Sequence, residues 1–234
     1  MKRRGPYPGK RAFDIVVASC ILLAALPLIV AAAIGVLLTS PGPVFYRARR
    51  VGKDGRPFLL YKLRSMTPSA SGTGSSITQV RDPRVYPFGA FLRKYKIDEF
   101  PQLINVLKGD MAIVGPRPED PGIVETYYTA RDRETLEMRP GLTSPGAIYY
   151  YTDLERKLEG DGSEAAYAAR ILPEVLAVEH VYLERESLWY DIRIVFRTAW
   201  AILLTMIDRD ASLRPPELDH IGGKTPDRQS ATGR

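Results

Sequence analysis

The chain has 234 residues and a formal net charge of +6, so it is long enough for one well-buried core, and its charge suits anionic lipid, nucleic acid or a phosphorylated substrate. One cysteine, Cys20, and two histidines, His180 and His220, exclude an internal disulfide, a Cys/His zinc cluster and, because no motif surrounds either histidine, a Ser-His-Asp triad. A bound metal would need oxygen ligands, which favours Mg²⁺ or Mn²⁺.

An uncharged apolar run from Ile15 to Leu38 follows a basic N-terminal segment, residues 1–14. At ~1.5 Å per residue the run reaches about 36 Å, enough to cross a ~30 Å hydrocarbon core. Basic residues flank it on both sides, and Pro27, near its middle, removes a backbone donor and bends a helix. We therefore expect a re-entrant helix-break-helix over residues 15–39, with an ordinary single span and a cleaved signal peptide as alternatives.

Turn residues at positions 40–43 end the apolar run, and two short apolar segments follow. Val44 to Tyr46 should pair with Phe58 to Tyr61 as a β-hairpin, because Gly-rich turn residues lie between them. Lys62 and Arg64 come directly afterwards at strand spacing, so we expect them to share one face. The polar stretch at positions 69–76 is typical of a flexible loop.

Two adjacent carboxylates, Asp98 and Glu99, precede Pro101 and a helix-periodic apolar pattern. Proline favours the first helical position, so the pair should lie at or near a helix N-terminus. There, one carboxylate could face a substrate while the other holds something beside it. The structural alternative is that Asp98 caps the helix, which stabilises a helix by roughly 0.5 to 2 kcal/mol.

Cations surround this carboxylate pair in the sequence. Arg93, Lys94 and Lys96 precede it, and Arg117 follows it in a rigid Gly-Pro-Arg-Pro turn. Arginine has a planar fork that binds two phosphate oxygens at once. Together with the Lys62 segment, these cations could converge on a diphosphate.

The C-terminal third is predicted to be helical. Residues 152–186 are charged and Ala/Leu-rich, which suggests two surface helices. Asp191 to Ile207 is strongly apolar but contains two arginines, so it is either an amphipathic helix in the membrane interface, with Trp189 and Trp200 at headgroup depth, or a buried core helix. The tail, residues 212–234, is expected to be disordered.

Residues 10–207 resemble the bacterial sugar transferases that are monotopic polyprenyl-phosphate phosphoglycosyl transferases. The matching segments are SPGPVFYRARRVGKDGRPF, YKLRSM, DEFPQLINVLKGDMAIVGPRPE, RPGLT and SLWYDIRIVFRTAW. The fold class expected from patterns and resemblance together is α+β and mainly helical. It comprises the re-entrant helix, a small β-hairpin, a helical catalytic region and amphipathic interfacial helices, with a cytoplasmic catalytic domain over residues 40–211.

The resemblance implies transfer of sugar 1-phosphate from a nucleoside diphosphate sugar, usually UDP-linked, to undecaprenyl phosphate, with release of UMP. It implies that Asp98 is the nucleophile, that Glu99 helps to hold Mg²⁺, and that Pro27 breaks the membrane helix. The implied phosphate contacts are Lys62, Arg64, Arg93 and Arg117. Such an enzyme would begin glycoconjugate or exopolysaccharide synthesis at the bacterial inner membrane, facing the cytoplasm.

The expected partners are a UDP-sugar, undecaprenyl phosphate and membrane lipids, with a homodimer as a further option. We expect no nucleic-acid binding, because the cations are interleaved with acids and no recognition motif is present. A non-catalytic scaffold that binds anionic lipid through the same basic face is the alternative function. Two departures from the family pattern are noted: Leu26 rather than Ser precedes Pro27, and Ser144-Pro145-Gly146 follows the RPGLT motif.

Overall fold

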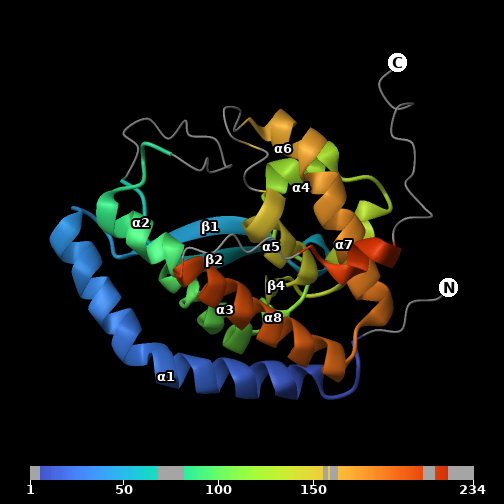
Figure 1. Ribbon diagram of the computed structural model, residues 1–234, viewed down its shortest axis with the longest axis horizontal. Helices are drawn as coiled ribbons and strands as arrows, with labels where there is room; N and C mark the ends of the chain where they lie inside the picture. The colour runs from blue at the N-terminus through green and yellow to red at the C-terminus, as the bar shows by residue number, and fades with distance from the viewer. Residues whose placement is uncertain (1–5, 68–81, 155–157, 159–162, 208–213, 221–234) are drawn as a thin grey trace.

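The computed structural model describes residues 6–67, 82–154, 158, 163–207 and 214–220, so the predicted loop at positions 69–76 lies outside it. The described chain is mainly helical with two small sheets, which confirms the predicted class (Figure 1). The helices are α1 (Lys10–Thr39), α2 (Pro87–Lys94), α3 (Gln102–Lys108), α4 (Pro121–Tyr127), α5 (Pro145–Tyr149), α6 (Glu164–Arg170), α7 (Leu172–Arg185) and α8 (Leu188–Met206). The strands are β1 (Phe45–Val51), β2 (Pro57–Leu63), β3 (Ala112–Val114) and β4 (Gly141–Thr143).

The apolar run forms one continuous helix, α1, rather than two helices separated by a break. It begins at Lys10, inside the segment predicted to precede the membrane helix, and Pro27 lies within it. Figure 1 shows α1 following the lower edge of the molecule and then bending upward beside α2. Proline removes one backbone donor and crowds the preceding turn, which bends a helix without necessarily ending it. Within the described residues, α1 is the one helix that is long and apolar enough to cross a membrane.

One face of α1 packs on the rest of the protein along its whole length. The buried apolar residues Ala18, Ala25, Ile29, Ala32 and Val36 recur at helical spacing. The opposite face exposes large apolar side chains: Ile15, Val16, Leu23, Leu26, Leu28, Val30, Ile34, Leu37 and Leu38. The helix therefore lies against the domain, with an apolar stripe directed away from it.

A hairpin forms here as predicted, but Phe58 to Tyr61 pairs with Arg47 to Arg50 rather than with Val44 to Tyr46. Strands β1 and β2 are antiparallel, with Tyr46 opposite Lys62. Asn105 of α3 holds the hairpin from the side, because its amide oxygen accepts a hydrogen bond from the Tyr61 N–H at 3.0 Å and its amide nitrogen donates to the Leu59 carbonyl at 2.7 Å. This contact ties the strand that carries Lys62 to the helix that follows Glu99.

Strands β3 and β4 form a parallel pair that the sequence did not predict. Each has three residues, too few for a period-2 pattern to show. Gly115, directly after β3, permits the close approach, since a Cβ there would lie 2.4 Å from the carbonyl oxygen of Arg139. The pair thus fixes where the Gly-Pro-Arg-Pro turn begins.

The prediction of two surface helices within residues 152–186 is wrong for α7. Helices α6 and α7 form there, but α7 is a core helix whose buried residues include Leu172, Val175 and Val178, because its apolar residues recur at i, i+3 and i+6. Part of the tail predicted to be disordered is also ordered, because Pro216–His220 forms a 3₁₀ helix that buries Glu217.

Helix α8 is amphipathic, as one of the two alternatives predicted. It buries Asp191, Ile194 and Ala201 and leaves Trp189, Phe196 and Trp200 exposed, among other large apolar residues. A fully buried core helix is therefore excluded.

Candidate active site

Asp98 and Glu99 lie in a 3₁₀ turn, Ile97–Glu99, directly before α3. The predicted position near a helix N-terminus is confirmed. Pro101 occupies the N-cap of α3 and no side chain caps that helix, so Asp98 has no capping role there. The turn is set by Lys96, whose φ of 56° lies in the left-handed region that few non-glycine residues adopt.

Asp98 is buried, with 3% of its surface exposed, and its Oδ1 has no hydrogen-bond partner in the described part of the chain. Burial raises the pKa of this carboxyl; the Lys62 ammonium opposes that rise, and the Glu99 carboxylate adds to it. A buried carboxylate oxygen without a donor is costly, so it marks a position where a ligand or a reacting atom can be accommodated.

Glu99, in contrast, has donors on both oxygens. Its Oε1 accepts hydrogen bonds from the Lys62 Nζ at 3.1 Å and from the Tyr151 hydroxyl at 3.0 Å, and its Oε2 accepts one from the Gln102 amide at 3.2 Å. Burial alone would raise the pKa of Glu99, but the charges of Lys62, Lys96 and Arg117 outweigh it and lower the pKa. Glu99 is therefore ionised beside an aspartate that resists ionisation.

Arg117 reaches this pair from the turn after β3. Its Nη1 donates to the Tyr151 hydroxyl at 3.2 Å, and its guanidinium carbon lies 4.5 Å from the ring centroid of Tyr150. The Nε lies 3.7 Å from the Glu119 carboxylate. Stacking and ion pairing hold the guanidinium at one edge of the cluster.

Tyr151 is a site residue that the sequence prediction missed. Its hydroxyl joins Glu99 to Arg117, and the Lys96 Nζ lies 3.2 Å from its ring centroid. The signal was the tyrosine run at positions 149–151, in the loop that departs from the family pattern. Periodicity does not show which of three adjacent tyrosines points into a site, and here a π-helical turn, Tyr150–Leu154, changes the spacing.

The two other predicted phosphate-binding cations, Arg93 and Arg64, differ from each other in whether they act on the carboxylate pair. Arg93, near the end of α2, favours the ionised form of Asp98 through its charge. The guanidinium of Arg64 is not brought to the cluster, because it donates to the carbonyls of Ser40, at 2.6 Å, and Pro41. Strand β2 ends at Leu63, so the alternation that placed Arg64 on the Lys62 face stops one residue too early. Arg64 instead holds the turn that follows α1.

The donor set fits a magnesium ion that is bound together with a phosphorylated substrate. No group of three or more His, Cys, Asp or Glu side chains with metal-binding spacing occurs among the residues that the structure describes. Mg²⁺, however, commonly takes only one or two carboxylates and completes its shell with substrate phosphates and water. Glu99 supplies one such carboxylate, and its lowered pKa keeps it ionised for this role.

Glu179 of α7 binds the backbone of the arginine turn. Its Oε1 accepts hydrogen bonds from the Ser144 hydroxyl at 2.5 Å and from the backbone N–H of Arg117 at 3.3 Å. Its Oε2 is buried without a hydrogen-bond partner in the described chain. Burial raises the pKa of Glu179 to about 8.

This raised pKa makes stability depend on pH. Because the usual value is 4.5, the folded protein keeps a proton on Glu179 that the unfolded chain has released, so the stability due to this group is full below that value and lost as pH rises towards 8. We expect Glu179→Gln, which cannot ionise, to flatten the fall in unfolding free energy between about pH 5 and pH 8. Denaturant titrations in detergent at several pH values measure this, and parallel slopes for the two proteins would contradict it.

Comparisons with known proteins identify relatives of this chain. The family model for bacterial sugar transferases matches residues 6–205. A UDP-glucose:undecaprenyl-phosphate glucose-1-phosphate transferase of Caulobacter vibrioides is 38% identical over 210 residues, which cover 86% of this chain and 74% of that protein. The protein of the same name in Escherichia coli is 37% identical over 196 residues, covering 82% of this chain and 39% of that protein. Exopolysaccharide production protein ExoY of Rhizobium meliloti is 34% identical over 211 residues, covering 84% of this chain and 86% of that protein.

The chain spans 35–43% of the length of several such relatives, which are larger proteins. The family match nevertheless includes α1, the hairpin, the carboxylate pair, the arginine turn and nearly all of α8. From the family match and from its similarity to these relatives, the chain belongs to the bacterial sugar transferase family.

Proposed function

We propose that this sugar transferase moves sugar 1-phosphate from a UDP-sugar to undecaprenyl phosphate and releases UMP, through a covalent phosphosugar intermediate on Asp98. The names of relatives support the two substrates, since they specify undecaprenyl phosphate as acceptor and UDP-glucose or UDP-N-acetylgalactosamine as donor. The name of the Rhizobium relative supports a place in exopolysaccharide synthesis. Because the donor sugars of these relatives differ, the proposal extends to the UDP-sugar class and not to one sugar.

The observation that carries the proposal is the buried Oδ1 of Asp98, which has no hydrogen-bond partner in the described chain and lies beside an ionised Glu99. The Oε2 of Glu179 also lacks a partner, but Asp98 differs from it because the charges of Lys62, Lys96 and Arg93 all act on its carboxyl. Lys62 and Arg117 lie close enough to Glu99 to lower its pKa and supply positive charge to the same place. An unpaired nucleophile inside a group of cations suits attack on a diphosphate.

In the proposed first step, Asp98 Oδ1 attacks the phosphorus that bears the sugar, and the bond from that phosphorus to the bridging oxygen breaks. UMP leaves with the electron pair, and a phosphosugar-aspartate forms. In the second step, a phosphate oxygen of undecaprenyl phosphate attacks the same phosphorus and the Asp98 carboxylate is released. Arg117 and Lys62 would offset charge on the phosphoryl oxygens in both steps.

We propose that Glu99 holds Mg²⁺ together with the donor diphosphate, which leaves Asp98 Oδ1 free to attack. The ion would supply charge neutralisation on the diphosphate oxygens and on the leaving UMP. Glu99 suits this role because its carboxylate is already ionised, and Lys62 keeps it oriented through the 3.1 Å contact.

We further propose that the exposed stripe of α1 enters one leaflet of the bacterial inner membrane and returns, with the active site on the cytoplasmic face. The bend of α1, a helix that contains Pro27, and its packing along the domain suit a helix that does not leave the protein to cross the bilayer (Figure 1). The exposed Trp189 and Trp200 of α8 suit headgroup depth.

The test is UMP release by the purified protein in detergent, with undecaprenyl phosphate and a panel of UDP-sugars. We expect release with at least one donor, dependent on undecaprenyl phosphate for repeated turnover and stopped by a chelator of divalent cations. Failure of every UDP-sugar in a preparation whose thermal unfolding is cooperative would contradict the proposal. Release that persists after chelation would contradict the magnesium role alone.

Tyr151→Phe should lower kcat/KM roughly ten- to hundredfold, because it removes the hydroxyl that joins Glu99 to Arg117. Hydrogen bonds to charged groups contribute about 1.5–3 kcal/mol, and each 1.36 kcal/mol is tenfold in rate. Tyr149→Phe is the matched control, since it removes a 2.8 Å phenol–carboxylate bond, to Glu174, outside the cluster. Equal losses in the two variants would show that the Tyr151 hydroxyl has no special role.

A further inference from the structure

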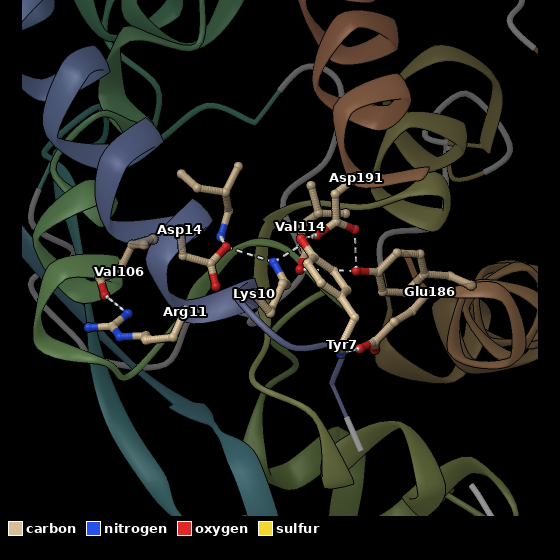
Figure 2. A network of polar contacts seen from close by, with 10 residues as sticks. Tyr7, Lys10, Arg11, Asp14, Val106, Val114, Glu186 and Asp191 are labelled. Atoms are coloured by element: carbon tan, nitrogen blue, oxygen red, sulfur yellow. Dashed lines mark hydrogen bonds and ion pairs between the residues drawn. The ribbon is translucent and has the colours of Figure 1, made fainter. Parts of the chain in front are cut away.

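The first turn of α1 carries two cations, Lys10 and Arg11, where the helix dipole disfavours positive charge. In the sequence, both belong to the basic segment, residues 1–14, that precedes the apolar run. In the structure their side chains turn back into the protein, as Figure 2 shows, and Lys10 is buried. Residues that break a local rule while making specific tertiary contacts have a role beyond the helix itself.

Arg11 holds the helix that follows the catalytic carboxylates. Its Nη1 donates to the carbonyl of Val106 at 2.6 Å and its Nη2 to that of Leu107 at 2.9 Å. These carbonyls lie in the last turn of α3, where the dipole favours a cation, and the Val106 carbonyl also accepts a hydrogen bond from the Gly109 N–H at 3.0 Å. The N-terminal end of the same seven-residue helix adjoins the Asp98–Glu99 turn. Arg11 therefore holds this helix at the end opposite to the two carboxylates.

Lys10 and Asp14 hold the strand that precedes Arg117. Asp14 Oδ1 accepts hydrogen bonds from the Lys10 Nζ at 2.6 Å and from the Ile113 N–H, in β3, at 2.9 Å. The Ala112 N–H donates to the carbonyl of Pro140, just before β4, whereas the N–H of the next residue, Ile113, is bonded by the carboxylate of Asp14, as a further strand would bond it.

Asp191 closes the network from α8. It is fully buried and lies 3.0 Å from the Lys10 Nζ, and its two oxygens accept hydrogen bonds from the hydroxyls of Tyr7, at 3.0 Å, and Tyr182, at 2.8 Å. The Tyr182 hydroxyl also lies 3.3 Å from the carbonyl of Val114, the last residue of β3. Asp14 therefore holds the Ile113 N–H of this strand, and the Tyr182 hydroxyl, bonded to Asp191, lies against the carbonyl at its end.

We propose that Lys10, Arg11 and Asp14, here called the α1 clamp, are positioning residues for the transfer reaction. The clamp fixes α3, and so Asp98 and Glu99, relative to β3, and so Arg117, from a single turn of the membrane helix. None of its three side chains is among the residues that contact Glu99 or Arg117. The inference rests on the proposed transferase activity and adds that the position of α1 on the domain determines the geometry of the site.

Two substitutions at Asp14 separate positioning from charge. Asp14→Asn retains an oxygen that can accept from the Ile113 N–H, whereas Asp14→Ala leaves that N–H without a partner. We expect Asp14→Asn to keep activity within about threefold, and Asp14→Ala to lower kcat/KM roughly ten- to hundredfold, since misplacement of about 1 Å can cost a hundredfold. Arg11→Met should cause a similar loss that Arg11→Lys partly restores, and it keeps the proposal testable if Asp14→Ala does not fold.

A double-mutant cycle tests the route through Arg117. If Asp14 acts by positioning that guanidinium, Asp14→Ala should cost much less in an Arg117→Lys background than in the native protein. The matched control is Glu217→Ala, which removes an equally buried carboxylate that binds Arg197 and Tyr190 and does not touch β3. Its effect should be small and independent of Arg117. Independent effects of Asp14→Ala and Arg117→Lys would overturn the proposal.

Hydrogen exchange separates the clamp from the proposed function, because it needs no substrate. We expect Asp14→Ala to speed exchange in the peptide around residues 111–117, and Arg11→Met in the peptide around 103–109, each at least about tenfold. Unchanged exchange in both variants would overturn the clamp. Faster exchange combined with native kcat/KM would overturn its catalytic consequence, whereas inactivity of the unsubstituted chain towards every donor would count against the proposed function.

Discussion

Asp98→Asn is expected to abolish formation of the phosphosugar-protein intermediate and to lower turnover by at least about 10⁴-fold, the scale on which removal of a catalytic nucleophile acts. Asparagine has nearly the same shape, so the buried site keeps its packing. Its amide, however, cannot form the acyl phosphate in the way an ionised carboxylate does. The measurement is retention of label on the acid-quenched protein after brief exposure to a UDP-sugar labelled in the phosphate next to the sugar.

Asp110→Asn is the control for this experiment. Asp110 lies just beyond α3 and accepts a 3.2 Å hydrogen bond from Asn105 of that helix. It is not among the largest causes of the pKa shift of Asp98. We expect Asp110→Asn to label like the native protein. Native labelling of Asp98→Asn would remove Asp98 as the nucleophile, and would leave Glu99, already surrounded by donors, as the less suitable alternative.

The acidic limb of the pH–rate profile is a second test of the Asp98 carboxyl. Because burial raises the pKa of Asp98, the ionised form that attacks phosphorus is lost at a higher pH than for an ordinary aspartate. Activity of the native protein should therefore begin to fall on acidification above the usual range of carboxylates, in single-turnover experiments that follow intermediate formation.

Local patterns predicted those parts of the site that lie close together in sequence. Pro101 and the apolar spacing after it located the carboxylate pair at the start of α3, and turn residues located the hairpin that carries Lys62. The start of a helix and the position of a hairpin turn are both determined by backbone preferences within a few residues. The cation of the arginine turn was also predicted correctly as part of the cluster, because Arg117 lies on a segment with little conformational freedom.

Residues brought in from distant segments were missed, or were expected in other roles. Tyr151 joins Glu99 only after a π-helical turn redirects it, and Asp14 meets Ile113 across 99 positions of sequence. Such contacts depend on how elements pack and leave no period in the sequence. Arg64 illustrates the reverse case: the strand pattern placed it beside Lys62, but the strand ends first and the guanidinium binds carbonyls after α1.

Lys10→Met should lower the unfolding free energy by about 3–5 kcal/mol, the usual loss when one member of a buried ionic group is removed. Lys10 is the ammonium between two buried carboxylates, at 2.6 Å from Asp14 and 3.0 Å from Asp191. Methionine fills much of the same space, so the loss reports charge rather than a cavity. The measurement is denaturant unfolding in detergent, followed by tryptophan fluorescence.

Asp14→Asn is the comparison that isolates this charge effect. It leaves one ammonium facing one carboxylate, a balanced pair, and should cost much less than Lys10→Met, which leaves two carboxylates facing each other. Protonation of either carboxyl relieves that repulsion, so the deficit of Lys10→Met should shrink on acidification towards about pH 5. Equal losses for the two variants, or a deficit that does not change with pH, would mean that Lys10 contributes through packing and that charge balance at the start of α1 is unimportant.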